Sequence, residues 1–238
     1  MDALTQADYL ALWESGQALH PIDQGLLAVQ AAFPETRQEN VADWPLGRRN
    51  RALAQLRCAC FGPILSGWTA CRQCGEKLEF KVDGNALIET GALADAPPTV
   101  SISGRVFRLP SSRDLARLAT QSAPASAVTQ LLDLCLVRED AGEAPTAWNE
   151  DDLETIGEQL SLADPLAEIL LDLRCPVCGD SFQESLDLAA FFWSELEGRS
   201  KRLLLDVHTL ASAYGWSEAE ILSLSPARRN FYREQVHA

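Results

Sequence analysis

The sequence predicts a mostly helical α+β fold, and three observations support that prediction. Most of the chain consists of segments with apolar residues at helical spacing, bounded by Pro, Gly or capping residues. Three short segments alternate polar and apolar residues, which is the pattern of half-buried strands in small antiparallel hairpins. Two Cys-x-x-Cys-Gly motifs, at 71–75 and 175–179, stand far apart in the chain. Its 238 residues are enough to bury a sizeable core.

The N-terminal region, residues 1–66, is expected to be helical. Pro21 and Pro45 each stand where a helix can begin, because proline fits the first helical turn. Gly16 ends the segment that precedes Pro21. The expected helices are 8–14, 21–33 and about 45–60.

The second region, residues 67–110, is expected to hold the first cysteine knuckle and short strands. The segment 77–82 follows the knuckle and alternates polar and apolar residues, so it is expected to be a strand. Asp83-Gly84 is a turn signal after it. The other expected elements are a loop at 92–98 and strands at 99–103 and 105–109, on either side of Gly104.

The third region, residues 111–173, is expected to be a helical insertion between the two cysteine motifs. Ser111 or Ser112 can cap its first helix, because a serine side chain accepts a hydrogen bond from the amides at a helix start. The expected helices are 112–118, 125–137, 150–160 and 164–173.

The last region, residues 174–238, is expected to hold the second knuckle and the C-terminal helices. Asp187 can cap a long helix, and Gly215 can close it with a left-handed residue. The expected elements are a short strand at 181–183, the long helix at 188–214, a short helix after the capping box of 217–220 and a terminal helix from Pro226.

The charge of the chain is strongly acidic and unevenly distributed. Its formal net charge is −14, and residues 139–190 hold 14 acidic groups and a single basic one, Arg174. Such a charge repels phosphate backbones, so non-specific binding of nucleic acid is not expected. The acidic stretch is either a solvated surface or a face that docks on a basic partner.

The sequence shows no targeting or membrane segment. Residues 1–5 lack the basic segment and apolar run of a secretory signal, and the longest strongly apolar run, 188–193, is too short to span a bilayer. Seven cysteines in a chain of this length are too sparse for a secreted disulfide scaffold. We therefore expect a soluble cytoplasmic protein without membrane insertion, and its release from the cell as part of a particle stays open.

The two cysteine motifs have the spacing of metal ligands. A Cys-x-x-Cys turn lets two sulfurs face one ion, and structural zinc takes four such ligands in a tetrahedron. Gly follows the second cysteine in both motifs, and Gly readily adopts the left-handed conformation that such a turn often needs. Strand-like segments follow both motifs, as in a zinc ribbon split by a long insertion. The sequence therefore predicts one structural Zn²⁺ ion, held by Cys71, Cys74, Cys175 and Cys178.

Other interpretations of the cysteines stay open. The Cys-Pro-Val-Cys run at 175–178 could be a thioredoxin-like redox motif, although no buried parallel strand is expected before it. A disulfide could join the two knuckles instead. A catalytic zinc would need an open coordination position, and the sequence has no His-Glu-x-x-His run, so we expect no catalytic residues and no enzyme. The remaining cysteines are expected in apolar surroundings: Cys58, Cys60 and Cys135.

Other candidate residues lack a catalytic context. The three histidines are scattered along the chain: His20, His208 and His237. The segment 211–232 could be interpreted as a helix–turn–helix that faces DNA with Arg228, Arg229 and Arg233. Residues 191–238 carry six acidic and six basic groups, however, so helical packing or docking on a protein is favoured.

Several segments together resemble one known family. Its most specific parts here are the paired knuckles and the Tyr-Gly-Trp-Ser-Glu run at 214–218; another is Trp-Pro-Leu-Gly-Arg-Arg-Asn at 44–50. The full set spans about residues 16 to 236 and comprises 44–50, 61–63, 71–80, 107–111, 114–115, 175–179, 191–196, 206–208, 213–222, 228–229 and Tyr232. This set is similar to baseplate proteins of contractile injection systems, which are related to the hub-assembly family of T-even phage baseplates.

The resemblance implies a structural component or assembly factor of a phage-tail-like baseplate. Its partners would be other baseplate, hub or spike proteins in a multi-protein assembly, and no catalytic residues are implied. From the predicted zinc site itself we expect the ion to clamp 71–82 against 175–183 and so to set the angle between the N-terminal and C-terminal helical regions. Two other functions stay open, namely a zinc-ribbon adaptor in transcription and a thiol–disulfide oxidoreductase.

Overall fold

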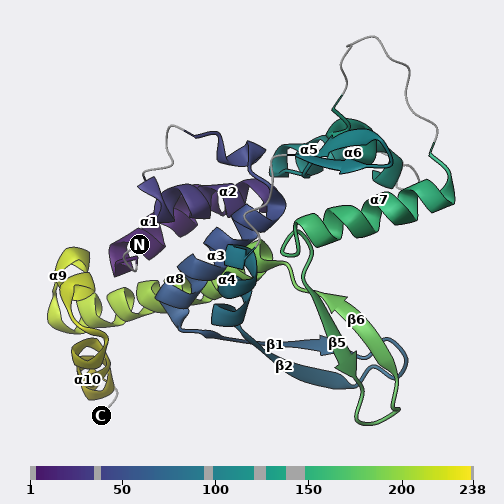
Figure 1. The fold of residues 1–238 in the computed structure, drawn as a ribbon. Coiled ribbons are helices and arrows are strands. Elements are labelled where there is room, and N and C mark those ends of the chain that lie inside the picture. The colour runs from purple at the N-terminus through teal and green to yellow at the C-terminus, as the bar shows by residue number, and fades with distance from the viewer. Residues whose placement is uncertain (1–3, 35–38, 94–98, 121–126, 138–147, 237–238) are drawn as a thin grey trace.

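The computed structural model describes residues 4–34, 39–93, 99–120, 127–137 and 148–236 (Figure 1). Within them the helices are α1 (Gln6–Gly16), α2 (Pro21–Ala32), the 3-10 helix η2 (Val41–Asp43), α3 (Leu46–Phe61), α4 (Gly84–Leu93), α5 (Ser112–Ala119), α6 (Ala127–Cys135), α7 (Glu150–Ala163), α8 (Leu188–Tyr214), α9 (Glu218–Ser223) and α10 (Pro226–Val236). The strands are β1 (Ile64–Ala70), β2 (Lys77–Asp83), β3 (Thr99–Ile102), β4 (Arg105–Arg108), β5 (Leu170–Arg174) and β6 (Ser181–Ser185). These strands form antiparallel pairs β1–β2, β3–β4 and β5–β6, so the predicted mostly helical α+β class is confirmed.

The boundaries of the C-terminal helices follow from capping residues, as predicted. The Asp187 carboxylate accepts hydrogen bonds from the first amides of α8. Helix α8 ends at Gly215, whose φ of +67° is in the left-handed region. Ser217 and Glu220 form a capping box at the start of α9.

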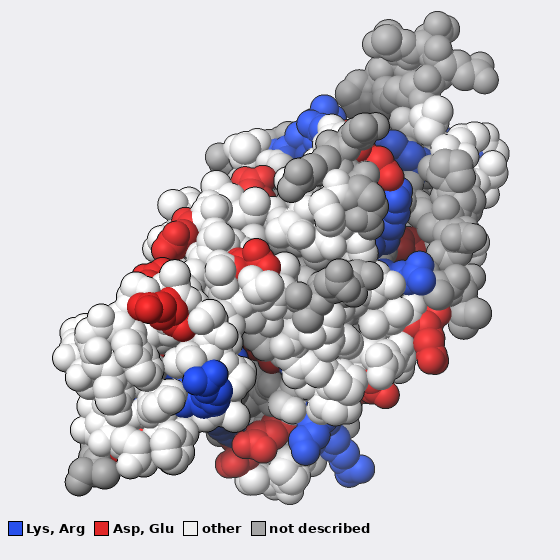
Figure 2. Space-filling view, turned by 90° about the vertical axis from the view of Figure 1, so that its left-hand side faces the viewer, with Lys and Arg blue, Asp and Glu red and all other residues white. Residues whose placement is uncertain are grey.

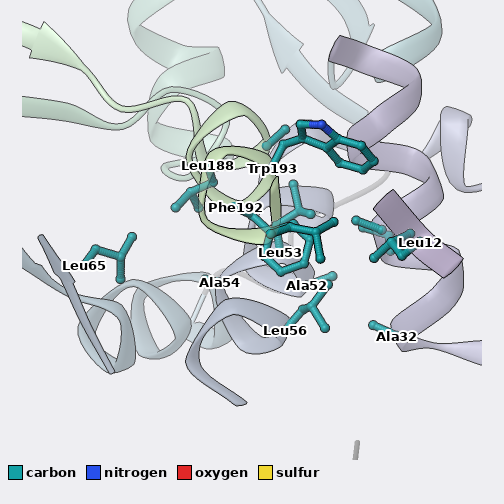
Figure 3. Close-up of a cluster of buried hydrophobic side chains, with 14 of the residues drawn as sticks. Leu12, Ala32, Ala52, Leu53, Ala54, Leu56, Leu65, Leu188, Phe192 and Trp193 are labelled. Atoms are coloured by element: carbon teal, nitrogen blue, oxygen red, sulfur yellow. The ribbon is translucent and has the colours of Figure 1, made fainter. Parts of the chain in front are cut away.

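The main core lies where α1, α2 and α3 pack against the long helix α8 (Figures 1 and 3). Leu53 and Leu56 of α3 are completely buried there, and Phe192 and Trp193 of α8 pack into the same cluster. Gly16 ends α1 directly against α8, and a Cβ atom at this position would overlap the Trp193 ring. The lack of a side chain at Gly16 therefore allows the close approach of α1 and α8.

A second, smaller core joins β3–β4 with α6 and α7. Phe107 is completely buried in it, together with Ile102, Leu132 and Ile156. Cys135 is also completely buried in this cluster, and burial raises the pKa of its thiol to about 12. Cys135 is therefore a core residue, as expected from its place on an apolar helical face.

A buried polar junction connects this second core to the start of α3. The Gly47 amide donates a hydrogen bond of 2.9 Å to the carboxylate of Asp164, the residue that ends α7. The Arg49 guanidinium donates to the Ser112 hydroxyl at 3.1 Å. Burial raises the pKa of Asp164, while its bond from Gly47 works in the opposite direction. The N-terminus of α3 is thus capped by a residue that is distant in the sequence.

The helix predicted over 164–173 is wrong, because Leu170–Arg174 forms the strand β5. The run Leu-Leu-Asp-Leu-Arg fits both a helical and an alternating pattern, so its own periodicity cannot decide between them. Pairing decides it, since β5 aligns with β6 so that Leu173 stands opposite Phe182. The helical insertion predicted between the knuckles therefore ends before this strand.

The turn predicted at Asp83-Gly84 is also wrong, because these residues connect β2 directly to α4. The Asp83 carboxylate accepts a hydrogen bond of 2.9 Å from the Asn85 amide, so it acts as a helix cap. Strand β1 and helix α4 are absent from the sequence prediction. Ser66 and Gly67 lie inside β1, and both residues weaken the strand signal there.

The helices that the structure describes include none with both the length and the hydropathy needed to cross a membrane. Some predicted features fall outside the described residues. These are 94–98 of the expected loop, 125–126 of the helix expected at 125–137, 139–147 of the acidic stretch, residues 1–3 and His237.

Candidate metal centre

Both cysteine motifs are the end loops of β-hairpins. Strands β1 and β2 pair up to Ala70 opposite Lys77, and β5 and β6 pair up to Arg174 opposite Ser181. The two hairpins extend together from the helical body (Figure 1). Each motif is therefore held between two paired strands, whereas the sequence predicted only the strand that follows it.

The two loops have the same backbone conformation. In the first loop the Cys71 amide donates to the Glu76 carbonyl at 2.8 Å, and the Gly75 amide donates to the Cys71 carbonyl at 2.9 Å. The second loop, 175–180, repeats these bonds at 2.8 and 3.0 Å. Gly75 and Gly179 both have a φ of +77°, which confirms the left-handed conformation predicted for them.

The four cysteine sulfurs converge on one point between the loops. Sγ atoms of Cys71, Cys74, Cys175 and Cys178 all lie within 4.8 Å of one another, and all four cysteines are free. The sulfurs of Cys71 and Cys178 are 3.6 Å apart, and so are those of Cys74 and Cys175. Sulfurs that bind one ion at about 2.3 Å in a tetrahedron would stand about 3.8 Å apart. The arrangement could therefore hold a metal ion, as the sequence predicted.

The site is buried on one side and exposed on the other. Cys71 and Cys175, the first cysteine of each motif, are only 3% and 1% exposed. They form a small apolar cluster with Leu78, Leu173 and Phe182 from the hairpin strands. Cys74 and Cys178 are exposed. The apolar cluster fixes the inner pair of sulfurs, and the loops position the outer pair.

The thiols of this site differ in how readily they lose their protons. Amide groups of Cys178 and Val177 point at the Cys175 sulfur and lower the pKa of this thiol to about 7. The Asp180 amide lowers the pKa of Cys178, but burial and the neighbouring thiols outweigh it and raise that pKa to about 12. Thiolates this close repel one another, so they cannot all ionise without a cation. A divalent metal ion would remove this conflict.

Arg72 forms a second connection between the hairpins. Its guanidinium, from the first loop, donates to the Gln183 carbonyl of β6 at 3.0 Å and forms an ion pair of 3.3 Å with Glu184. It also lies 5.6 Å from the centre of the Phe182 ring. Sequence reasoning missed Arg72, because a lone arginine between two cysteines carries no signal of its contact with a segment more than 100 residues away.

The other candidate residues stand elsewhere in the described part of the chain. His20 caps α2 through its Nδ1 atom, and His208 is exposed on α8, so neither joins the cysteine group. Arg229 is only 2% exposed and forms an ion pair of 2.9 Å with Asp206. The helix–turn–helix interpretation needs Arg229 at the surface, so its burial counts against DNA binding.

The described surface shows no strongly basic face in the view of Figure 2, where acidic and basic side chains are interspersed in small groups. Comparison of the chain with family models, curated proteins and solved structures found no match. The assignment of a function therefore depends on the sequence and on the geometry of the site.

Proposed function

We propose that the four cysteines hold one structural Zn²⁺ ion that joins the two hairpins. An all-sulfur tetrahedral set favours zinc or iron over the harder metals that prefer oxygen. Zinc is favoured between these two because closed four-cysteine sites of this kind commonly hold it for structural purposes. Such a site leaves no open position for water or substrate, so the centre supplies stability and no catalysis.

The observation that carries this proposal is the convergence of sulfurs from two separate hairpins. The paired sulfurs belong to residues 101 and 107 positions apart, so a bound ion would tie together distant parts of the chain. Strand β1 follows α3, and β6 leads into α8, the two helices at the centre of the main core. The ion would thus set how the hairpins extend from the helical body.

Metal analysis tests the proposed zinc site directly. We expect the protein purified under reducing conditions to contain one zinc per chain, and Cys178→Ser to release the metal and to melt at a lower temperature. Unchanged zinc content in Cys178→Ser would refute the site. Visible absorption typical of an iron–thiolate centre would show that the site holds iron instead of zinc.

We further propose that the protein is a structural component or an assembly factor of the baseplate of a phage-tail-like contractile injection system. The support is the resemblance, together with the places that its residues occupy. Residues 44–50 and 107–111 meet at the buried polar junction, where the Leu46 amide donates to the Pro110 carbonyl at 3.0 Å.

The outer face of α7 is the surface that we expect to meet neighbouring proteins. Asp151, Glu154 and Glu158 are exposed along one side of this helix, at the spacing of successive turns. Leu162 continues the same side and is 73% exposed. A basic surface of another baseplate, hub or spike protein would complement this face.

Co-purification tests the assembly role. A tagged chain expressed in cells that produce tail-like particles should be recovered with sheath, tube or spike proteins, either in finished particles or in assembly intermediates. Replacing Asp151, Glu154 and Glu158 by Asn or Gln should weaken this recovery, while the same change at the exposed residues Glu218 and Glu234 should not. Recovery of the chain alone, from cells that contain assembled particles and intermediates, would contradict the role.

A thiol–disulfide oxidoreductase is the second candidate, and one observation favours it. The Cys175 thiol has a pKa of about 7, which is in the range of reactive cysteines. The amides that cause this shift belong to a hairpin loop, however, and the same donors stabilise metal-bound thiolates. Reduction of insulin disulfides by the metal-loaded protein would support the enzyme, and its absence is expected here.

A further inference from the structure

The metal site contains two kinds of sulfur, and each exposed sulfur contacts a buried one. Cys74 and Cys178 are exposed, whereas Cys71 and Cys175 are buried in the apolar cluster. Both sulfur contacts of 3.6 Å join an exposed cysteine of one hairpin to the buried cysteine of the other, namely Cys178 to Cys71 and Cys74 to Cys175. The two contacts correspond to each other, because the two loops have the same conformation.

We propose that this centre is also an oxidation site, where a peroxide converts the metal link into two disulfides between the hairpins, Cys71–Cys178 and Cys74–Cys175. The inference rests on the proposed zinc site for the identity of the ion that is released. It concerns the chemistry of these thiolates and is independent of the assembly role.

The oxidation proceeds from the exposed sulfurs inward. An exposed thiolate attacks one oxygen of hydrogen peroxide, the O–O bond breaks, and a sulfenic acid and a hydroxide ion form. The contacting thiolate of the opposite hairpin then attacks the sulfenic sulfur, so an S–S bond forms and a second hydroxide ion leaves. Repetition at the second pair consumes four thiolates and two peroxide molecules. The products are two disulfides, four hydroxide ions and a free Zn²⁺ ion.

All four sulfurs lie within 4.8 Å of one another, and the two contacts of 3.6 Å favour links between the hairpins. A sulfenic acid at Cys178 has the Cys71 sulfur in contact, and the Arg72 ion pair with Glu184 holds the two loops together while the metal leaves. Disulfides between the loops therefore need little movement. The consequence is that oxidation removes the metal and still leaves the two hairpins covalently joined, whereas chelation under reducing conditions leaves only the Arg72 contacts and the apolar packing between them.

The experiment uses the full-length, metal-loaded protein, treated with hydrogen peroxide and denatured with free thiols blocked. Two equivalents of peroxide should release the zinc, as a colorimetric indicator reports, and the protein should have lost four hydrogen atoms relative to its reduced form. Trypsin cleaves after Arg57, Arg72, Lys77, Arg174 and Arg199, so Cys71, Cys74 and the second motif fall in separate peptides. Disulfides between the hairpins join all three peptides, 58–72, 73–77 and 175–199, into one species. Fragmentation of this species between Cys175 and Cys178 should place 73–77 on Cys175 and 58–72 on Cys178, and the reverse placement would overturn the proposed pairing.

Disulfides within each motif would give a different set of linked peptides. They would join 58–72 to 73–77 and leave 175–199 closed on itself, and this result would overturn the proposal. Metal release with all four thiols still reduced would overturn it as well. A Cys58→Ser, Cys60→Ser double variant is the control, because these thiols share the 58–72 peptide and should not change the products. If the purified protein holds no metal, the zinc proposal fails, and peptide mapping of the oxidised metal-free protein still tests the pairing.

Discussion

Replacing Cys71 by Ser removes a buried sulfur from the centre of the proposed zinc site. Cys71 is 3% exposed and its sulfur contacts that of Cys178, 107 positions further along the chain. In the chain-entropy model, a link that closes a loop of about 100 residues stabilises the folded state by about 4.7 kcal/mol. For a chain of this size, each 1 kcal/mol lowers the melting temperature by about 2–4 °C. Loss of the link should therefore lower it by about 10–20 °C.

The assay combines calorimetry with metal analysis, and Cys135→Ser is the matched control. This control makes the same chemical change at a completely buried cysteine of the second core, away from the four sulfurs. Burying a hydroxyl there should cost about 1–3 kcal/mol and leave the zinc content at one per chain. If Cys71→Ser kept its zinc, or lost it with no change in melting temperature, the ion would not be the link described here.

Three further predictions concern parts of the fold that do not touch the metal. Phe107→Ala should lower the free energy of unfolding by about 3–5 kcal/mol without changing the zinc content, because Phe107 is completely buried in the second core and not in the cysteine cluster. Denaturant unfolding measures the stability, and metal analysis measures the zinc content. Asp206→Asn should cost about 3–5 kcal/mol in the same assay, since it leaves the buried Arg229 guanidinium without its carboxylate. Burial raises the pKa of Asp114, but hydrogen bonds from Arg108 and Ser111 outweigh it and hold that pKa below its usual value. This stabilisation is complete above the unfolded pKa of about 3.9 and is lost as pH falls through the lower folded value. Melting curves between about pH 5 and 3 should therefore show a smaller loss of stability for Asp114→Asn than for the unchanged protein.

Capping and spacing explain why much of the helical architecture could be predicted. Asp187 and Gly215 are specific signals for the start and the end of α8, because each meets a local requirement of the backbone. The grouping of the four cysteines could be predicted for a similar reason. The loop 71–75 and its counterpart both need a left-handed Gly after the second cysteine, and this requirement is visible in the sequence.

Contacts between separate segments explain most of what could not be predicted. The segment 170–174 is a strand only because 181–185 lies beside it, and its own residues suit a helix equally well. Asp83-Gly84 has the composition of a turn, but the Asp83 side chain caps the helix that follows. Arg72 acquires its role only when the second hairpin comes within reach. The strand and the Arg72 contact depend on partners that their own segments do not specify, whereas the Asp83 cap is a local contact whose residues also fit a turn.

The most direct test of the account is X-ray absorption spectroscopy at the zinc edge on the purified protein, with the metal content measured on the same sample. The account predicts one zinc per chain with four sulfur neighbours at about 2.3 Å and no nitrogen or oxygen ligand. A shell of nitrogen or oxygen atoms, or fewer than four sulfurs, would show that Cys71, Cys74, Cys175 and Cys178 do not share one ion, and would contradict the link between the hairpins.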